Sequence, residues 1–202
     1  MSKTDEIGDL LSTEFTTRNW HEYSICQRLS AMALPEYNKL VNDQWVFPAP
    51  YNRLIERLTQ LCHAHYGERL VSLVIYGSLG RGTATPESDV DLLIVAENLP
   101  KGRIPRVQDF LGIEWQLREE FNFHFELSPV FKTPAEVQVG SPLFLDMTED
   151  AILLFDRNRF FERFLESLRE RLRKLGAKRV WLGNAWYWDL KPDHRPGEVF
   201  EI

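Results

Sequence analysis

The stretch Val71–Ala96, VSLVIYGSLGRGTATPESDVDLLIVA, most constrains what this chain can fold into. Two apolar, β-prone runs flank a segment rich in glycine and turn residues, which predicts two strands joined by a structured turn. Residues i and i+2 of a half-buried strand point to one face, so we expect Asp89 and Asp91 to stand side by side with Val90 turned away. Adjacent carboxylates repel each other unless a cation or proton lies between them. The stretch therefore predicts a site for a divalent cation such as Mg²⁺ at the start of the second strand.

The glycines of the turn indicate that a ligand approaches the backbone closely at this point. Successive backbone N–H groups, together with the Ser78 hydroxyl, can cradle phosphate oxygens, and a helix that begins in or after the turn would add its positive end. Arg81 can add a charge-assisted contact. We therefore expect Gly77, Ser78 and Arg81 to bind phosphate oxygens of a ligand. The structural alternative is that the Gly-Ser turn and the nearby aspartates only connect the two strands of a hairpin and bind no ligand.

The segment Asn122–Val130 supplies a candidate for a third carboxylate. Its strict alternation predicts a strand with apolar residues on one face and polar residues on the other. The apolar set is Phe123, Phe125 and Leu127, and the polar set is Asn122, His124, Glu126 and Ser128. On this pattern Glu126 is the best-placed partner for Asp89 and Asp91, and His124 is the second choice. Such a site could hold two metal ions, which would activate an attacking hydroxyl and stabilise a pyrophosphate leaving group.

This constellation resembles the active-site signature of the DNA polymerase beta-like nucleotidyltransferases, in which a Gly-Ser turn precedes Asp-x-Asp on the next strand. The matching residues, in order, are Gly77, Ser78, Arg81, Gly82, Ser88, Asp89 and Asp91. The resemblance is specific over Val71–Ala96 and extends through Val130. It is strongest to the small stand-alone prokaryotic members, which include antitoxin-type enzymes that transfer AMP to a toxin partner and aminoglycoside-modifying enzymes. The third acid of the family is often Asp, whereas the candidate here is Glu126.

The resemblance implies an α/β (α+β) nucleotidyltransferase fold, with a mixed β-sheet flanked by helices. It also implies Mg²⁺ (or Mn²⁺) as cofactor and a nucleoside triphosphate as donor. The implied reaction transfers a nucleoside monophosphate to a hydroxyl acceptor and releases pyrophosphate. Asp89, Asp91 and Glu126 would be the catalytic metal ligands, with Glu126 either the third ligand or the base that takes the acceptor's proton. The sequence identifies neither the nucleobase nor the acceptor, which can be a small molecule or a protein.

Two further functions are compatible with the sequence. The first is a catalytically silent binding partner, antitoxin-like or regulatory, with an aromatic tail that contributes to an interface with another protein or with a second copy of the chain. The second is a nucleic-acid polymerase. A formal net charge of −6 and a length of 202 residues argue against that reading, because the charge is acidic and the length leaves little room for separate template-gripping domains.

The apolar periodicity divides the chain into three predicted parts. Residues 1–50 are expected to form an N-terminal helical arm or cover, 51–156 the nucleotidyltransferase core, and 157–202 a C-terminal helix and tail packed on the core. The predicted helices are 51–66, 105–120, 134–139, 142–149 and 157–175. The predicted strands are 71–76, 89–96, 122–130 and 151–155. The aromatic tail after Gly176 is expected to pack back as an arm.

The cysteines and the N-terminal sequence bear on the compartment. Cys26 and Cys62 have no metal-type spacing and are interpreted as reduced, buried thiols. The first ten residues lack the pattern of a signal peptide, and no run of apolar residues is long enough to span a bilayer. We therefore expect a cytoplasmic protein that does not enter a membrane.

Overall fold

A computed structural model of the chain describes residues 40–41, 44–45, 47, 51–85, 87–183, 185–195 and 197–200. These residues all belong to one compact unit, Asn38–Ile202. The predicted helical arm over residues 1–50 and Cys26 within it lie outside the described residues, apart from Phe47 and two short strands. These strands, β1 (Leu40–Val41) and β2 (Gln44–Trp45), pair antiparallel.

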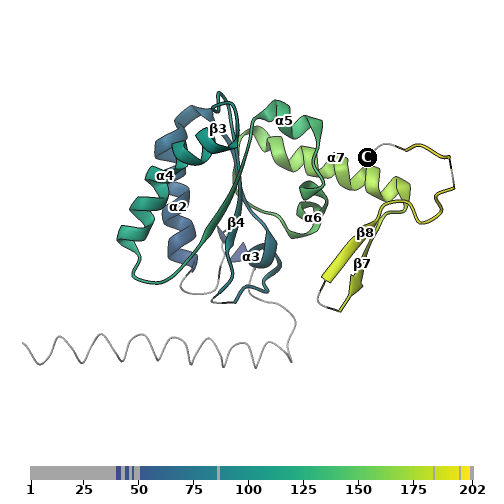
Figure 1. The fold of residues 1–202 in the computed structure, drawn as a ribbon, viewed down its shortest axis with the longest axis horizontal. Helices are drawn as coiled ribbons and strands as arrows, with labels where there is room; N and C mark the ends of the chain where they lie inside the picture. Colours follow the sequence, from purple (N-terminus) through teal and green to yellow (C-terminus); the bar gives the residue numbers. More distant parts are fainter. Residues whose placement is uncertain are drawn as a thin grey trace, which may run out of the picture. The chain divides into compact units, whose positions relative to one another are not determined.

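A four-stranded sheet forms the centre of the unit (Figure 1). Its strands are β3 (Leu70–Ile75), β4 (Val90–Ala96), β5 (Leu127–Lys132) and β6 (Ile152–Asp156), in the spatial order β5-β4-β3-β6. Strand β4 pairs parallel with β5, and β3 pairs antiparallel with both β4 and β6. The mixed sheet and its flanking helices confirm the predicted fold class.

Helices cover both faces of the sheet (Figure 1). Helices α2 (Tyr51–Tyr66) and α4 (Arg103–Glu120) cover one face. The other face is covered by α5 (Pro134–Val139), α6 (Leu143–Asp150) and α7 (Phe160–Leu175). In β4, Leu92 and Ile94 join the core under α2 and α4, whereas Leu93 and Val95 join the core under α5 to α7. A strand that is buried on both faces explains the unbroken apolar run of the sequence.

The strand predicted over residues 122–130 begins only at Leu127, so that prediction is wrong for its first five residues. The cause is the start of its neighbour, because β4 begins at Val90 and offers no backbone partner further back. The last bond of the ladder runs from the Val90 N–H to the Glu126 carbonyl oxygen, at 2.8 Å. The predicted alternation of burial nevertheless holds, since Phe125 is buried while its neighbours His124 and Glu126 are exposed.

The C-terminal part differs from its prediction in two places. The α-helix predicted from residue 157 begins at Phe160, because Asn158 and Arg159 have positive φ and a 3-10 turn, η2 (Arg157–Arg159), precedes it. The tail, for which only an arm that packs back was predicted, contains an antiparallel hairpin of β7 (Lys178–Leu182) and β8 (Ala185–Asp189). The hairpin follows from β-prone aromatic residues on either side of Gly183, whose φ is +62°.

Two short helical turns complete the described elements. Helix α3 (Gly77–Arg81) contains the Gly-Ser turn, and a 3-10 turn, η1 (Gly67–Arg69), links α2 to β3. In the part of the chain that the structure describes, no helix has the length and apolar character required to cross a membrane.

Candidate active site

The residues of the sequence motif meet at one edge of the sheet. Strand β3 ends there and continues into α3, while the antiparallel β4 and its parallel neighbour β5 both begin there. Asp91 stands opposite Ser128 in the register of β4 and β5. The Tyr76 N–H donates to the Asp91 carbonyl oxygen at 3.1 Å, which fixes the start of α3 against β4. The topology thus brings the Gly-Ser turn and the carboxylates to the same edge.

Gly77 and Asp91 are in direct contact. Gly77 has a φ of +67°, and a β-carbon at this position would lie 2.0 Å from Asp91 Oδ2. Both the backbone conformation and the lack of space therefore require glycine. The same close approach leaves the Asp91 carboxylate against the first residue of α3.

Asp91 alternates with Leu93 and Val95 on the side of β4 that faces α5 to α7, Val90 is buried on the other side, and Asp89 directly precedes the strand. Burial, followed by the nearby charge of Asp89, raises the pKa of Asp91, whereas the Arg81 guanidinium lowers it. Ser128 Oγ donates a hydrogen bond to Asp89 Oδ2 at 3.2 Å, which orients the more exposed carboxylate. Two repelling carboxylates with hard oxygen atoms are a donor set that fits Mg²⁺ or Mn²⁺.

Glu126 does not join the aspartates in the described structure. Its side chain is 61% exposed and lies 3.7 Å from His124 Nε2, whose own side chain is 77% exposed. Within the described ranges no group of three or more His, Cys, Asp or Glu side chains is arranged to hold a metal ion. The backbone of Glu126 is nevertheless tied to the start of β4, one residue from Asp89. Its role as third ligand or base stays a prediction.

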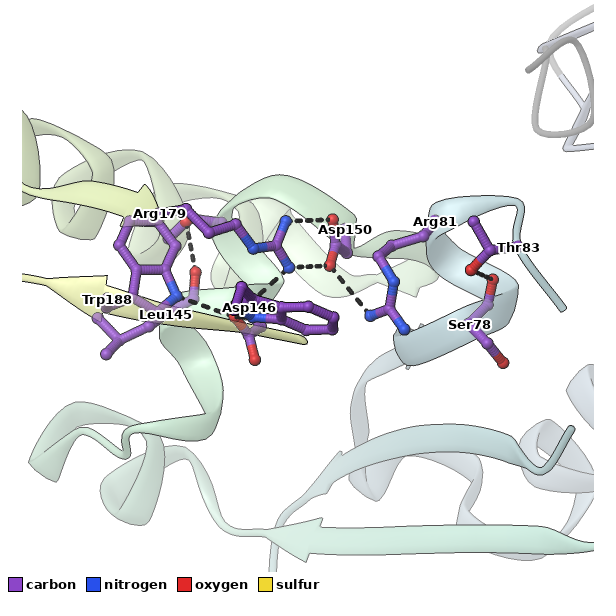
Figure 2. A network of polar contacts seen from close by, with 10 residues as sticks. Ser78, Arg81, Thr83, Leu145, Asp146, Asp150, Arg179 and Trp188 are labelled. Carbon is purple, nitrogen blue, oxygen red and sulfur yellow. Dashed lines mark hydrogen bonds and ion pairs between the residues drawn. The ribbon is translucent and has the colours of Figure 1, made fainter. Parts of the chain in front are cut away.

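The remaining predicted residues, Ser78 and Arg81, lie on α3. The Ser78 carbonyl oxygen accepts the Thr83 N–H at 2.9 Å, which closes the end of this short helix. Arg81 Nη1 lies 3.3 Å from Asp150 Oδ2 on α6 (Figure 2). Its guanidinium carbon is also 4.5 Å from the centre of the Trp186 ring, a cation–π contact. Arg81 is therefore held between the turn and the C-terminal hairpin.

Two residues hold the loop in front of Asp89, a role that the sequence patterns do not predict. The Tyr51 hydroxyl lies 3.3 Å from the carbonyl oxygens of both Thr85 and Ser88 and donates its one proton to them in a bifurcated hydrogen bond. Ser88 Oγ accepts the Thr85 N–H at 2.9 Å. Ser88 belongs to the signature, so its importance is visible in the sequence although its structural role is not. Tyr51 lies in another helix, and no local pattern connects it to the loop.

Comparisons with known proteins agree with this geometry. Residues 55–154 match the model of the nucleotidyltransferase domain family. A protein of Methanocaldococcus jannaschii, provisionally named a protein adenylyltransferase, is 29% identical over 141 residues, which are 69% of this chain and 93% of that protein. A bifunctional uridylyltransferase/uridylyl-removing enzyme of Vibrio campbellii is 38% identical over 71 residues, or 33% of this chain and 8% of the enzyme.

Solved structures with some similarity include toxin–antitoxin proteins. One is a crystal structure of a toxin–antitoxin with AMP-PNP, at 17% identity and a TM-score of 0.43, covering 59% of this chain and 90% of that chain. Another is the tri-AMPylated Shewanella oneidensis HEPN toxin in complex with the MNT antitoxin, at 16% identity and a TM-score of 0.37, covering 61% and 86%.

The family match begins inside α2 and ends inside β6, and it includes the Gly-Ser turn, the aspartate pair and Glu126. The M. jannaschii relative extends the similarity to most of the chain. Because the matched residues include those that the fold gathers at one edge of the sheet, we identify residues 55–154 as a nucleotidyltransferase domain.

Proposed function

We propose that this nucleotidyltransferase uses Mg²⁺ to transfer AMP from ATP to a hydroxyl group of a protein, with release of pyrophosphate. The observation that carries the proposal is the contact between Asp91 and Gly77, which joins a carboxylate pair to the turn expected to hold phosphates. The choice of AMP and of a protein acceptor is supported by the name of the M. jannaschii relative, which spans most of this chain. A soluble, cytoplasmic location belongs to the same proposal.

The residues would divide the work as follows. Backbone N–H groups at Gly77 and the Ser78 hydroxyl bind oxygens of the triphosphate, and Arg81 adds a positive charge at the end of the same turn. Asp89 and Asp91 would be the ligands of the cation. A bound Mg²⁺ would neutralise the triphosphate and stabilise the charge that develops on the pyrophosphate.

The transfer requires one bond to form and one to break. The acceptor oxygen bonds to the α-phosphorus, the bond from this phosphorus to the bridging oxygen of the β-phosphate breaks, and pyrophosphate leaves. The acceptor's proton must move to a base, and the Glu126 carboxylate is our candidate when it is not itself a metal ligand. Its exposure is compatible with contact to a protein acceptor that approaches from solvent.

The experiment uses ATP that carries the label either in the α- or in the γ-phosphate. Purified protein is incubated with a cell lysate and Mg²⁺, and labelled proteins are separated and identified by mass spectrometry. Relative to the lysate without added protein, the proposal predicts additional labelled proteins with α-labelled ATP and none with γ-labelled ATP, and the loss of this added labelling with a chelator and with D91N. Labelling from the γ-position would instead indicate phosphoryl transfer, and preference for labelled UTP would correct the nucleobase.

A catalytically silent binding partner is the second candidate. The exposed Glu126 favours it, because the acids that the described structure brings together are two rather than three. Such a protein could bind Mg²⁺ and ATP, but it would transfer no label to any acceptor in the same experiment. Calorimetry with ATP and Mg²⁺ then separates a silent nucleotide-binding protein from one that has lost nucleotide binding altogether.

A further inference from the structure

The C-terminal hairpin is joined to helices α6 and α3 by a compact polar network (Figure 2). Trp186 Nε1 and Trp188 Nε1 both donate to Asp146 Oδ1, at 2.8 and 2.9 Å. Arg179 of β7 pairs with Asp150, the last residue of α6. The network thus reaches from the tail of the chain to the end of the helix that packs against the Gly-Ser turn.

Asp150 is shared unequally between two arginines. Arg179 binds both carboxylate oxygens, with Nη1–Oδ1 at 3.0 Å and Nη2–Oδ2 at 2.5 Å. Arg81 reaches only Oδ2, at the longer distance of 3.3 Å. The side chains of Arg179 and Asp150 are 12% and 8% exposed, so water screens this pair poorly. Arg179 therefore neutralises Asp150, and Arg81 makes only a weak contact with it.

Both guanidinium groups also contact the same aromatic ring. The guanidinium carbons of Arg81 and Arg179 each lie 4.5 Å from the centre of the Trp186 ring. A ring face offers a cation an attraction that leaves its N–H groups available for oxygen ligands. Arg81 is thus located by the indole without having its hydrogen-bonding capacity filled.

We propose that Arg179 is a positioning residue, which occupies Asp150 and thereby leaves Arg81 available for the triphosphate of the donor nucleotide. This inference rests on the proposed function, since it assigns a cause to phosphate binding at the same site. Without Arg179, the buried Asp150 carboxylate has Arg81 as its nearest remaining cation, and a buried carboxylate demands a full partner. The present weak contact between Arg81 and Asp150 would then become a full ion pair, which leaves Arg81 less available to bind phosphate oxygens.

The test measures the Kd of inorganic tripolyphosphate with Mg²⁺ by calorimetry in five proteins: wild type, R179A, R179K, D150N and the R179A/D150N double variant. We expect R179A to weaken binding by about tenfold, the scale of one charge-assisted hydrogen bond. R179K, which keeps a charge beside Asp150, should weaken it less. D150N alone should change the Kd little, and the double variant should recover binding, because a neutral amide in place of the carboxylate does not attract Arg81.

Recovery is the result that a merely structural role of Arg179 would not produce. If Arg179 only attached the hairpin, D150N would remove a further contact and leave the double variant as weak as R179A or weaker, which would overturn the proposal. R171A, an exposed arginine on α7, serves as the control for loss of one positive charge. Circular dichroism melting of every variant verifies that the fold is retained.

The outcome is independent of nucleotidyl transfer, which is measured in parallel with α-labelled ATP. If the variants show the expected Kd values but the wild type transfers no label, the role of Arg179 is supported and the proposed reaction is wrong. If the wild type transfers label but the variants do not show the expected Kd values, the proposed reaction is supported and the role of Arg179 is wrong. A wild type that does not bind tripolyphosphate would reject the role of Arg179 directly.

Discussion

Asp91 Oδ2 occupies the space that a side chain on Gly77 would need, at 2.0 Å from the position of its β-carbon. We predict that G77A abolishes nucleotide transfer, because the added methyl group must displace either the carboxylate or the turn. The change also places a non-glycine residue at a φ of +67°. Transfer of α-labelled AMP and the free energy of unfolding in urea are the two measurements.

A matched control is available at Gly67, which has a φ of +53° but nothing within 4 Å of the added β-carbon. G67A should cost about 1–2 kcal/mol of stability from backbone strain alone and leave transfer intact. If G67A and G77A reduced transfer equally at a temperature where both are folded, the contact with Asp91 would have no special part in the activity.

The second prediction concerns the opposed effects of Asp91 on activity and stability. Because burial and the Asp89 charge raise the pKa of Asp91, its ionised form is disfavoured in the fold. D91N should therefore lower transfer by at least about 100-fold, since a metal ligand is lost, while metal-free D91N is as stable as the wild type or more stable at pH 7. Mn²⁺ titration and urea unfolding provide the measurements.

The sign of the pH dependence follows from the raised pKa. A group with a raised pKa in the folded state lends stability below its ordinary pKa, and this contribution is lost as the pH rises through the folded value. The advantage of D91N over the wild type should thus appear as the pH rises from acid toward neutral. A metal-free D91N that is clearly less stable than the wild type at pH 7 would refute this account.

The sequence predicted the chemistry-bearing part of the fold well because that part depends on local patterns. The turn after β3, the start of β4 beside the two aspartates and the limits of α2 all follow from glycine placement and apolar periodicity. For Glu126, local patterns predict only part of what the structure shows. Its alternation with Phe125 predicts correctly that its side chain is exposed, but the position of its carboxylate depends on a segment before β5 that pairs with no neighbouring strand.

The ion pair between Arg179 and Asp150 is a contact that could not be predicted from the sequence. The two residues lie 29 positions apart, on a hairpin and a helix end, and nothing in either local pattern selects one for the other. The aromatic residues of the tail predict an arm that packs back, but they do not predict its partner. Contacts of this kind follow from the tertiary arrangement, which also brings Arg81, the predicted phosphate ligand, into contact with Asp150.

The third prediction concerns Ser88, whose hydroxyl accepts the Thr85 N–H and so closes the loop before Asp89. S88A should lower stability by about 1 kcal/mol, as expected for the loss of one hydrogen bond, and should weaken Mn²⁺ binding several-fold because Asp89 is held less firmly. Mn²⁺ titration and urea unfolding report the two effects. S167A on α7 is the control, and equal effects of both variants on Mn²⁺ affinity would show that the loop does not position the carboxylate.

The last prediction concerns Glu136, at the start of α5. Hydrogen bonding with the Arg106 guanidinium, at 2.8 and 3.0 Å, and with Thr133 lowers the pKa of Glu136 to about 2. A lowered pKa gives stability that is present above the ordinary value, near 4.5, and is lost as the pH falls toward 2. E136Q keeps a side chain that can still serve the capping box with Thr133, so it removes the charge while retaining the cap.

The free energy of unfolding should therefore favour the wild type over E136Q at pH 7, and this difference should shrink steadily between about pH 4.5 and pH 2. Urea unfolding across this range measures it, with E119Q, at an exposed position of α4, as the control for loss of a surface carboxylate. A wild-type advantage that stays constant from pH 7 to pH 3 would show that the Arg106 contact contributes nothing through the ionised carboxylate.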